Sequence, residues 1–163
     1  MHMVSTYYTS PLGTLLIQCN NDCISAILFK DEKEEATHST EHPILQSCVQ
    51  QLDEYFDGKR KIFDLPLQQQ GTDFQTKVWE LLYTIPYGKT ISYMQLAKQY
   101  GDVKAIRAIA SANGKNNIAI IVPCHRVIGS NASLTGYAGG LWRKKWLLEH
   151  EAQYHSGVQL LDF

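Results

Sequence analysis

The chain has 163 residues, of which 44% are hydrophobic and 19% are charged, and its formal net charge is −1. This balance is typical of a globular protein with one good core or two small domains. The sequence argues against a membrane protein, because no apolar run approaches the roughly 20 residues of a membrane span and no basic-then-apolar leader opens the chain. We therefore expect a cytoplasmic protein without membrane contact, in which the few, irregularly spaced cysteines are free thiols, namely Cys19, Cys23, Cys48 and Cys124.

Charge is distributed unevenly along the chain. Residues 1–72 hold 5 basic and 10 acidic residues, a balance of −5, whereas residues 73–163 hold 10 basic and 6 acidic residues, a balance of +4. A basic second part could face an anion such as DNA. Because the surplus is small, we expect such an affinity to be moderate and sensitive to salt.

The first part of the chain has the pattern of a small sheet followed by one helix. Three short runs rich in β-branched and aromatic residues predict strands at 4–9, 14–19 and 23–29. After a charged loop at 31–42, apolar residues recur at helical spacing from Pro43 to Phe56, and Gly58 ends this helix. No chemistry converges here, so we predict a scaffold domain at 1–67 and a linker at 68–72.

The second part, 73–163, is predicted to be mainly helical. Thr72 and Gln75 have the spacing of a capping box, Ser92 is a cap for a helix at 93–100, and Gly101 ends that helix. A further helix at 103–113 would complete a helix-turn-helix. We expect it to carry Lys104 and Arg107 outward and to face the core with Val103, Ile106 and Ala110, with Ile109 as a further candidate. A last amphipathic helix is predicted at 141–151.

The pentapeptide Pro123-Cys124-His125-Arg126-Val127 holds the most reactive side chains. It follows the apolar run 118–122, which we interpret as a buried strand or extended segment. A thiol beside an imidazole is a candidate nucleophile, because only the thiolate attacks carbon. The alternative is an ordinary core cysteine, since neighbours on an extended backbone point to opposite faces.

Seven segments of the second part form one pattern in chain order, namely Gly71-Thr72-Asp73-Phe74-Gln75, Pro86-Tyr87-Gly88, Ile91-Ser92-Tyr93, Ala105-Ile106-Arg107-Ala108, Ile121-Val122-Pro123-Cys124-His125-Arg126-Val127, Gly136-Tyr137-Ala138-Gly139-Gly140 and Trp146-Leu147-Leu148-Glu149-His150-Glu151. Taken together, these segments resemble the O6-alkylguanine-DNA alkyltransferases, the methylated-DNA–protein-cysteine methyltransferases. The amino-terminal part resembles the family more loosely, through Ser10-Pro11-Leu12-Gly13 and Tyr55-Phe56-x-Gly58. The resemblance implies an α+β protein, with a ribonuclease-H-like amino-terminal domain and a winged helix-turn-helix carboxy-terminal domain.

The resemblance also implies a role for each matching residue. Cys124 would accept the alkyl group irreversibly in one turnover, without a cofactor, and His125 would take its proton through a water molecule. Glu151, otherwise interpreted as a solvated acid at a helix end, would orient His125. Tyr93 would give a proton to the departing guanine, and Asn116 would brace the turn beside the nucleophile.

DNA contacts and the substrate pocket follow from the same resemblance. Arg107 would enter the duplex where the damaged base is flipped out, in the minor groove and with little sequence preference. A monomer is expected. Further DNA-binding residues would be Tyr93, Ala105, Lys104, Ser92 and Arg126, and the pocket would be lined by Val127, Tyr137, Ala138 and Gly139.

The chain departs from the family pattern at three places. Ala138 replaces a serine of some members, which leaves only its backbone N–H for the guanine oxygen, and Ala119 replaces a pocket proline of some animal members. Asn20 and Ser25 stand where animal members carry zinc ligands. We therefore predict no metal, and we interpret Cys19 and Cys23 as hairpin cysteines.

Other functional classes remain open from the sequence. A damage sensor would flip the base without transfer, but such relatives lack the acceptor cysteine. A helix-turn-helix regulator would need an additional metal domain, for which 163 residues leave no room. A cysteine hydrolase would turn over an ester.

Overall fold

The computed structural model describes residues 3–30, 41–129, 137 and 139–155. The chain divides into two compact units, of which the first comprises Met1–Gln70 with Asn117–Ala119 and the second comprises Gly71–Asn116 with Ile120–Phe163.

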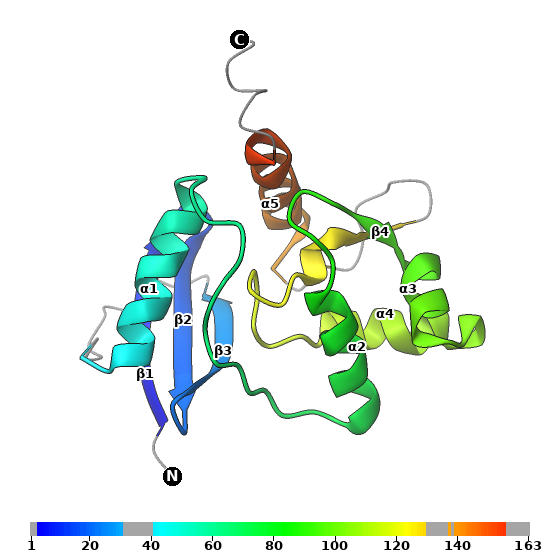
Figure 1. Cartoon of the computed structure of the whole chain (residues 1–163), viewed down its shortest axis with the longest axis horizontal. Helices are drawn as coiled ribbons and strands as arrows, with labels where there is room; N and C mark the ends of the chain where they lie inside the picture. Colours follow the sequence, from blue (N-terminus) through cyan, green and yellow to red (C-terminus); the bar gives the residue numbers. More distant parts are fainter. Residues whose placement is uncertain (1–2, 31–40, 130–136, 138, 156–163) are drawn as a thin grey trace. The chain divides into compact units, whose positions relative to one another are not determined.

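The first unit is built on a three-stranded antiparallel sheet in the order β1-β2-β3 (Figure 1). Its strands are β1 (Met3–Ser10), β2 (Gly13–Asn20) and β3 (Cys23–Lys30), which confirms the predicted strands. Asn21 and Asp22 form the turn between β2 and β3 with φ values of 54° and 62°. Such a left-handed pair has the twist that a two-residue hairpin requires.

Helix α1 (Pro43–Phe56) covers this sheet, and its bounds match the predicted helix. His42 caps the helix by accepting a hydrogen bond from the Ile44 N–H, and Pro43 occupies the first turn, where its missing N–H costs nothing. Alternate residues of β2 and one face of α1 are buried, which forms the core of the unit, with Leu15, Ile17, Cys19, Leu45, Cys48, Leu52 and Tyr55.

The outer edge of β3 is paired with two separate segments. Ile24 exchanges hydrogen bonds with Pro66 and Gln68, and Ile27 exchanges them with Asn117 and Ala119. Ile24 and Ile27 are three residues apart, a spacing at which the backbone groups of a regular strand face opposite edges. The register shift at Gln18 and Cys19 places one extra residue in β3 between them. This bulge turns the backbone groups of both residues to the same outer edge.

In its described residues the second unit has four α-helices, α2 (Asp73–Tyr83), α3 (Tyr93–Tyr100), α4 (Ile106–Gly114) and α5 (Leu141–Tyr154). Thr72 forms the predicted capping box with Gln75, and Ser92, which was predicted as a cap, forms a capping box with Gln95. Helix α4 packs on α2 and α3, and the Trp79 indole N–H donates to the Ala112 carbonyl at 2.9 Å. Helices α3 and α4 with the turn at Gly101 form the helix-turn-helix.

The predicted helix at 103–113 is wrong in its first turn. Val103–Ala105 is a separate 3₁₀ helix, η1, and the Asp102 carboxylate accepts from the Lys104 N–H at 2.9 Å. This tight turn leaves Val103 46% exposed rather than buried. Ile109 is fully buried instead, and Ala112 and Asn113 are also buried, whereas Ile106 and Ala110 are half-buried.

The predicted strand or extended segment at 118–122 is also wrong, although its burial is confirmed. Ile118 makes a single bridge to Ile27, and the chain then turns, with Ile120 at a φ of 73°. The Asn116 side-chain amide closes this turn by donating to the Val122 carbonyl at 2.8 Å. Five apolar residues in a row reveal burial but not conformation.

A short parallel pair positions the reactive segment of the second unit. Strand β4 (Ile91–Ser92) pairs with β5 (Val127–Ile128), so that Ile91 lies opposite Val127. Tyr93 follows β4 directly, and the 3₁₀ helix η2 (Cys124–Arg126) precedes β5 directly. The pairing therefore joins the entry of α3 to the strand that follows the Cys-His segment. Among the described residues, no helix is long and apolar enough to span a bilayer.

Candidate active site

Cys124 lies at the start of η2 with its side chain buried. Its Sγ accepts a hydrogen bond from the Asn116 side-chain amide at 3.3 Å, and only 7% of the residue is exposed. Because the same amide nitrogen donates to the Val122 carbonyl, Asn116 fixes both the turn and the sulfur. The structure thus brings together two residues that the sequence proposed as nucleophile and brace.

His125, the residue after Cys124, forms a buried pair with Glu151. His125 Nε2 lies 2.7 Å from Glu151 Oε2, and the two side chains are 0% and 1% exposed. The interpretation of Glu151 as a solvated acid is therefore wrong. Nδ1 of His125 is buried and has no hydrogen-bond partner among the described residues, so it is the ring atom available for a proton.

Three further donors converge on the Glu151 carboxylate. Arg126 donates from Nε at 2.8 Å and from Nη2 at 3.1 Å, and the Gly88 N–H donates at 3.3 Å. Burial by itself would raise the pKa of Glu151, but the charge and hydrogen bonds of His125 and Arg126 outweigh it and hold that pKa well below its usual range. Glu151 is therefore ionised at neutral pH.

The predicted DNA contact of Arg126 is wrong. The side chain is 7% exposed, and its Nη1 donates to the Ile85 carbonyl at 2.6 Å. The guanidinium also lies 5.7 Å from the centre of the Tyr87 ring. Since its fork is bound to Glu151 and Ile85, Arg126 braces the buried carboxylate instead of facing DNA.

A buried lysine that sequence reasoning missed completes the site. Lys144 of α5 is 0% exposed, and its Nζ donates to the Val127 carbonyl at 2.6 Å. The Nζ atom also lies 6.0 Å from the centre of the half-buried Tyr93 ring. The spacing of Lys144, Leu147 and Glu151 places them on one helix face, a signal that could have identified the lysine.

The thiol and this lysine influence each other. Burial raises the pKa of Cys124 above its ordinary value, and the Asn116 hydrogen bond and the positive charge of Lys144 offset only part of that rise. Burial in turn lowers the pKa of Lys144 to about 8, and Cys124 opposes that change. The fraction of Cys124 that is ionised therefore depends on Asn116 and Lys144, which oppose the effect of burial.

The predicted pocket residues lie beside this arrangement. Val127 and Gly139 are buried, and the Arg143 guanidinium donates to the Gly139 carbonyl at 2.9 Å. Burial, with a contribution from Cys124, raises the pKa of Tyr137 well above its ordinary value. Ala138 lies outside the described residues.

The predicted DNA-binding residues other than Arg126 lie on or beside the helix-turn-helix. Lys104 and Arg107 are exposed, and Ala105 and Ser92 are half-buried. The Ser92 hydroxyl accepts from the Gln95 N–H at 3.0 Å, so its first role is to cap α3.

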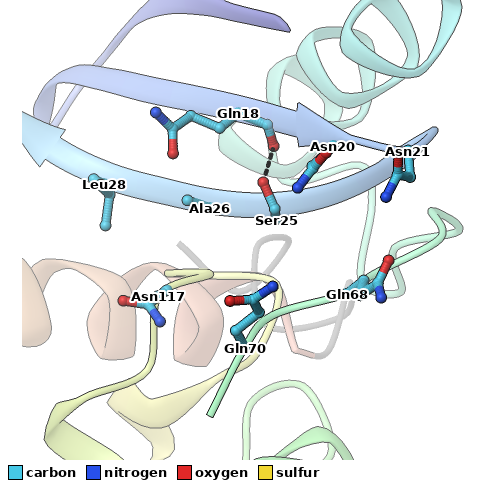
Figure 2. Close-up of a pocket in the computed structure, with 9 residues that line it drawn as sticks. All are labelled: Gln18, Asn20, Asn21, Ser25, Ala26, Leu28, Gln68, Gln70 and Asn117. Atoms are coloured by element: carbon cyan, nitrogen blue, oxygen red, sulfur yellow. Dashed lines mark hydrogen bonds between the residues drawn. The ribbon is translucent and has the colours of Figure 1, made fainter. Parts of the chain in front are cut away.

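The first unit contains a polar cavity of about 480 Å³ at the edge of β3 (Figure 2). Asn20 and Ser25, which stand where animal members carry zinc ligands, line it together with Gln18, Asn21, Ala26, Leu28, Gln68, Gln70 and Asn117. This lining has amides and a hydroxyl but no thiol, imidazole or carboxylate. Across the described residues, no group of three or more His, Cys, Asp or Glu side chains is arranged to hold a metal ion.

Comparison with known proteins matches both parts of the chain to one family. Residues 3–69 match the model of the 6-O-methylguanine DNA methyltransferase ribonuclease-like domain, and residues 73–153 match its DNA-binding domain. The constitutive methylated-DNA–protein-cysteine methyltransferase of Bacillus subtilis is 49% identical over 143 residues, which are 82% of this chain and 87% of that protein.

Solved structures agree with this match. The crystal structure of the Mycobacterium tuberculosis O6-methylguanine methyltransferase has a TM-score of 0.84 and 40% identity, covering 99% of this chain and all of that one. The structure of Mycobacterium tuberculosis OGT in complex with DNA has a TM-score of 0.82 at the same identity and coverage. The expected α+β fold, a small ribonuclease-like sheet domain and a helical DNA-binding domain, is confirmed, and the chain belongs to the 6-O-methylguanine DNA methyltransferase family, whose activity is alkyl transfer from DNA to a protein cysteine.

Proposed function

We propose that this protein repairs duplex DNA by transferring an alkyl group, in the first instance methyl, from the O6 atom of guanine to the Sγ of Cys124. The observation that carries the assignment of the acceptor is the buried constellation of Cys124 hydrogen-bonded to Asn116, next to a His125–Glu151 pair. The transfer is irreversible and each molecule reacts once, because the product is a thioether.

The chemistry divides into three coupled changes. His125 accepts the thiol proton of Cys124 through a water molecule, and the sulfur electron pair then forms a bond to the methyl carbon. The bond between this carbon and O6 breaks, its electron pair passes to the guanine, and Tyr93 donates a proton to the departing base. No cofactor, oxidant or reductant is needed for this balance.

Ionisation alone gives only part of the rate. A thiol with a pKa near 8.5 is about 3% thiolate at pH 7, so complete ionisation would gain roughly thirtyfold, or about 2 kcal/mol. Positioning of the methyl carbon and protonation of the leaving base must supply the rest. The hydrogen bond from Asn116 to Sγ supports the positioning part.

DNA is bound through the helix-turn-helix, with the target base flipped out of the duplex. The exposed Lys104 and Arg107 support contacts to the phosphates and to the gap left by the base. Binding is in the minor groove with little sequence preference, and the protein acts as a monomer in the cytoplasm. Residues 1–67 act as a scaffold joined by the linker 68–72 to the reactive domain 73–163.

A stoichiometric reaction tests the proposal. The protein is incubated with a duplex that holds one O6-methylguanine, and its tryptic peptides are weighed. We expect one added methylene unit on the peptide 116–126, which contains Cys124, stopping at one equivalent. Cys124→Ala should gain nothing, whereas Cys23→Ala, which removes a half-buried thiol of the first unit, should react normally.

The other outcomes identify the alternative functions. Tight binding to the lesion without a mass gain would mean a damage sensor. Repeated turnover of an ester without methyl transfer would mean a hydrolase. Either result would overturn the proposal.

A further inference from the structure

We propose that Lys144 is a positioning residue of the transfer, whose buried ammonium group favours the thiolate of Cys124 and fixes the Val127 carbonyl at the wall of the substrate pocket. This inference rests on the proposed function for the reaction that it serves. Its test does not require DNA, so the two can fail separately.

The burial of Lys144 is the first observation. Lysine is almost never fully buried unless it has a specific partner, because its charge loses hydration in the interior. Lys144 is 0% exposed, whereas the side chain of Lys145, the next residue of α5, is 66% exposed to solvent. The adjacent position on the same helix thus shows what an ordinary lysine does there.

The contacts of Lys144 point to the reactive segment. Its Nζ donates to the Val127 carbonyl at 2.6 Å, three residues after the nucleophile and at the first residue of β5. It also lies 6.0 Å from the centre of the Tyr93 ring. One ammonium group is therefore held between the elements that carry the proposed nucleophile and the proposed proton donor.

The two arginines near Cys124 make hydrogen bonds to other groups. Arg126 is bound to Glu151 and to the Ile85 carbonyl, and Arg143 is bound to the Gly139 carbonyl. Lys144 is the basic group whose charge acts on the Cys124 thiol, and Cys124 acts on Lys144 in return. The titratable and charged groups facing this pair are Tyr93 of α3, His125 and Arg126 of η2, Tyr137 before α5, and Arg143 and Glu151 of α5.

The coupling has a defined sign. The pKa of Lys144 is lowered to about 8, so the ammonium charge is present at neutral pH and is lost as the pH rises through that value. While it is present, it stabilises the thiolate and lowers the pKa of Cys124. Removing the charge should raise the pKa of Cys124 and reduce the thiolate fraction tenfold for each unit of increase.

The experiment compares Lys144→Met with Lys145→Met. Each protein is methylated with methyl iodide from pH 5 to pH 10, and the rate is followed by the mass of the peptide 116–126. We expect Lys144→Met to react at least tenfold more slowly than the wild type at pH 7, with the difference disappearing at the alkaline end, where Lys144 of the wild type has lost its charge. Lys145→Met should follow the wild-type profile throughout.

Two results would overturn the inference. An unchanged profile would show that Lys144 has no influence on the thiol. A reduction by the same factor at every pH would show a merely structural role.

A second measurement covers the case in which Lys144→Met does not fold. The ¹³Cε resonance of Lys144 is titrated in the wild type and in Cys124→Ala. Loss of the thiolate should lower the pKa of Lys144, because Cys124 opposes the effect of burial on this lysine. An equal pKa of Lys144 in both proteins would show that Cys124 and Lys144 are not coupled.

Discussion

Glu151 is the residue on which the buried polar groups of the second unit converge. Its carboxylate accepts from His125, from two nitrogens of Arg126 and from the Gly88 N–H. A buried charge is tolerated only when it is paired and hydrogen-bonded, and removal of one partner leaves the other uncompensated. Glu151 thus holds His125 in its orientation and also holds the second unit together.

Substitution of Glu151 should therefore be costly to stability. We expect Glu151→Gln to lower the free energy of unfolding by about 3 kcal/mol, because Arg126 is left buried without its counter-charge. Glu149→Gln is the matched control, since Glu149 is 68% exposed and its pair with Lys145 spans 3.8 Å; its cost should be below about 0.5 kcal/mol. Urea unfolding at pH 7 measures both, and equal costs would contradict the prediction.

The same carboxylate gives stability a pH dependence. The pKa of Glu151 in the folded protein is below its unfolded value near 4.3, so its contribution is complete above about pH 5 and is lost as the pH falls toward the folded pKa. The wild type should lose this stability during acidification. Glu151→Gln should show a flatter acid limb, and urea midpoints measured from pH 6 to pH 3 check this.

At the scale of elements, the ends of the helices were predictable because their signals are local. Ser92 and Gln95 form the capping box of α3, and Gly101 ends the helix with a φ of 104°. A residue other than glycine is strained in that conformation. The turn of the helix-turn-helix therefore depends on the backbone freedom of one glycine.

A pair of glycines isolates this backbone effect. A Cβ added at Gly101 or at Gly114 would meet nothing within 4 Å, but only Gly101 has a positive φ. Gly101→Ala should lower the free energy of unfolding by about 1–2 kcal/mol through backbone strain. Gly114→Ala should raise it by roughly 0.5 kcal/mol, because alanine restricts the unfolded chain. Thermal or urea unfolding that gave the two variants the same sign would refute the explanation.

Elements whose conformation is set by a distant or side-chain contact were less predictable. The Asp102 cap turned the first residues of the expected helix at 103–113 into η1 and exposed Val103. The Asn116 hydrogen bond bent the apolar run 118–122 into a turn. In both cases hydrophobic periodicity reports burial, whereas one polar contact decides the backbone.

At the scale of the whole molecule, the two parts of the chain differ in net charge. The excess of basic residues lies in 73–163, the part that matches the DNA-binding domain of the family, and 1–72 is acidic. Positive charge near phosphates releases counterions when DNA binds. The modest surplus sets the size of the salt effect.

Binding to DNA should therefore weaken moderately with salt. For two to three phosphate contacts we expect the affinity for a duplex to fall roughly 10- to 40-fold between 50 and 200 mM salt. Arg107→Ala should weaken binding and transfer from duplex DNA but leave the methyl iodide reaction of Cys124 unchanged. Fluorescence anisotropy titrations give the slope, and an affinity independent of salt would contradict the assignment.

The composition of the site was predictable only where family motifs mark it. Cys124, His125 and Glu151 were identified by resemblance, and the structure brings His125 and Glu151 into contact. Arg126 was misassigned because sequence does not show whether an arginine faces solvent or a buried carboxylate. Lys144 was missed because a lysine in an amphipathic helix is ordinarily solvated.

The three residues 117–119 have a consequence for how the chain can be divided. They complete the edge of β3 in the first unit, yet Asn116 and Ile120 on either side of them belong to the second. No single cut therefore yields two complete pieces. A fragment that began at Gly71 would carry these residues away from Ile27, and a fragment that ended at Gln70 would leave the backbone of Ile27 unpaired. A gene fusion, a truncation or a split-protein reporter should therefore keep both units in one continuous chain.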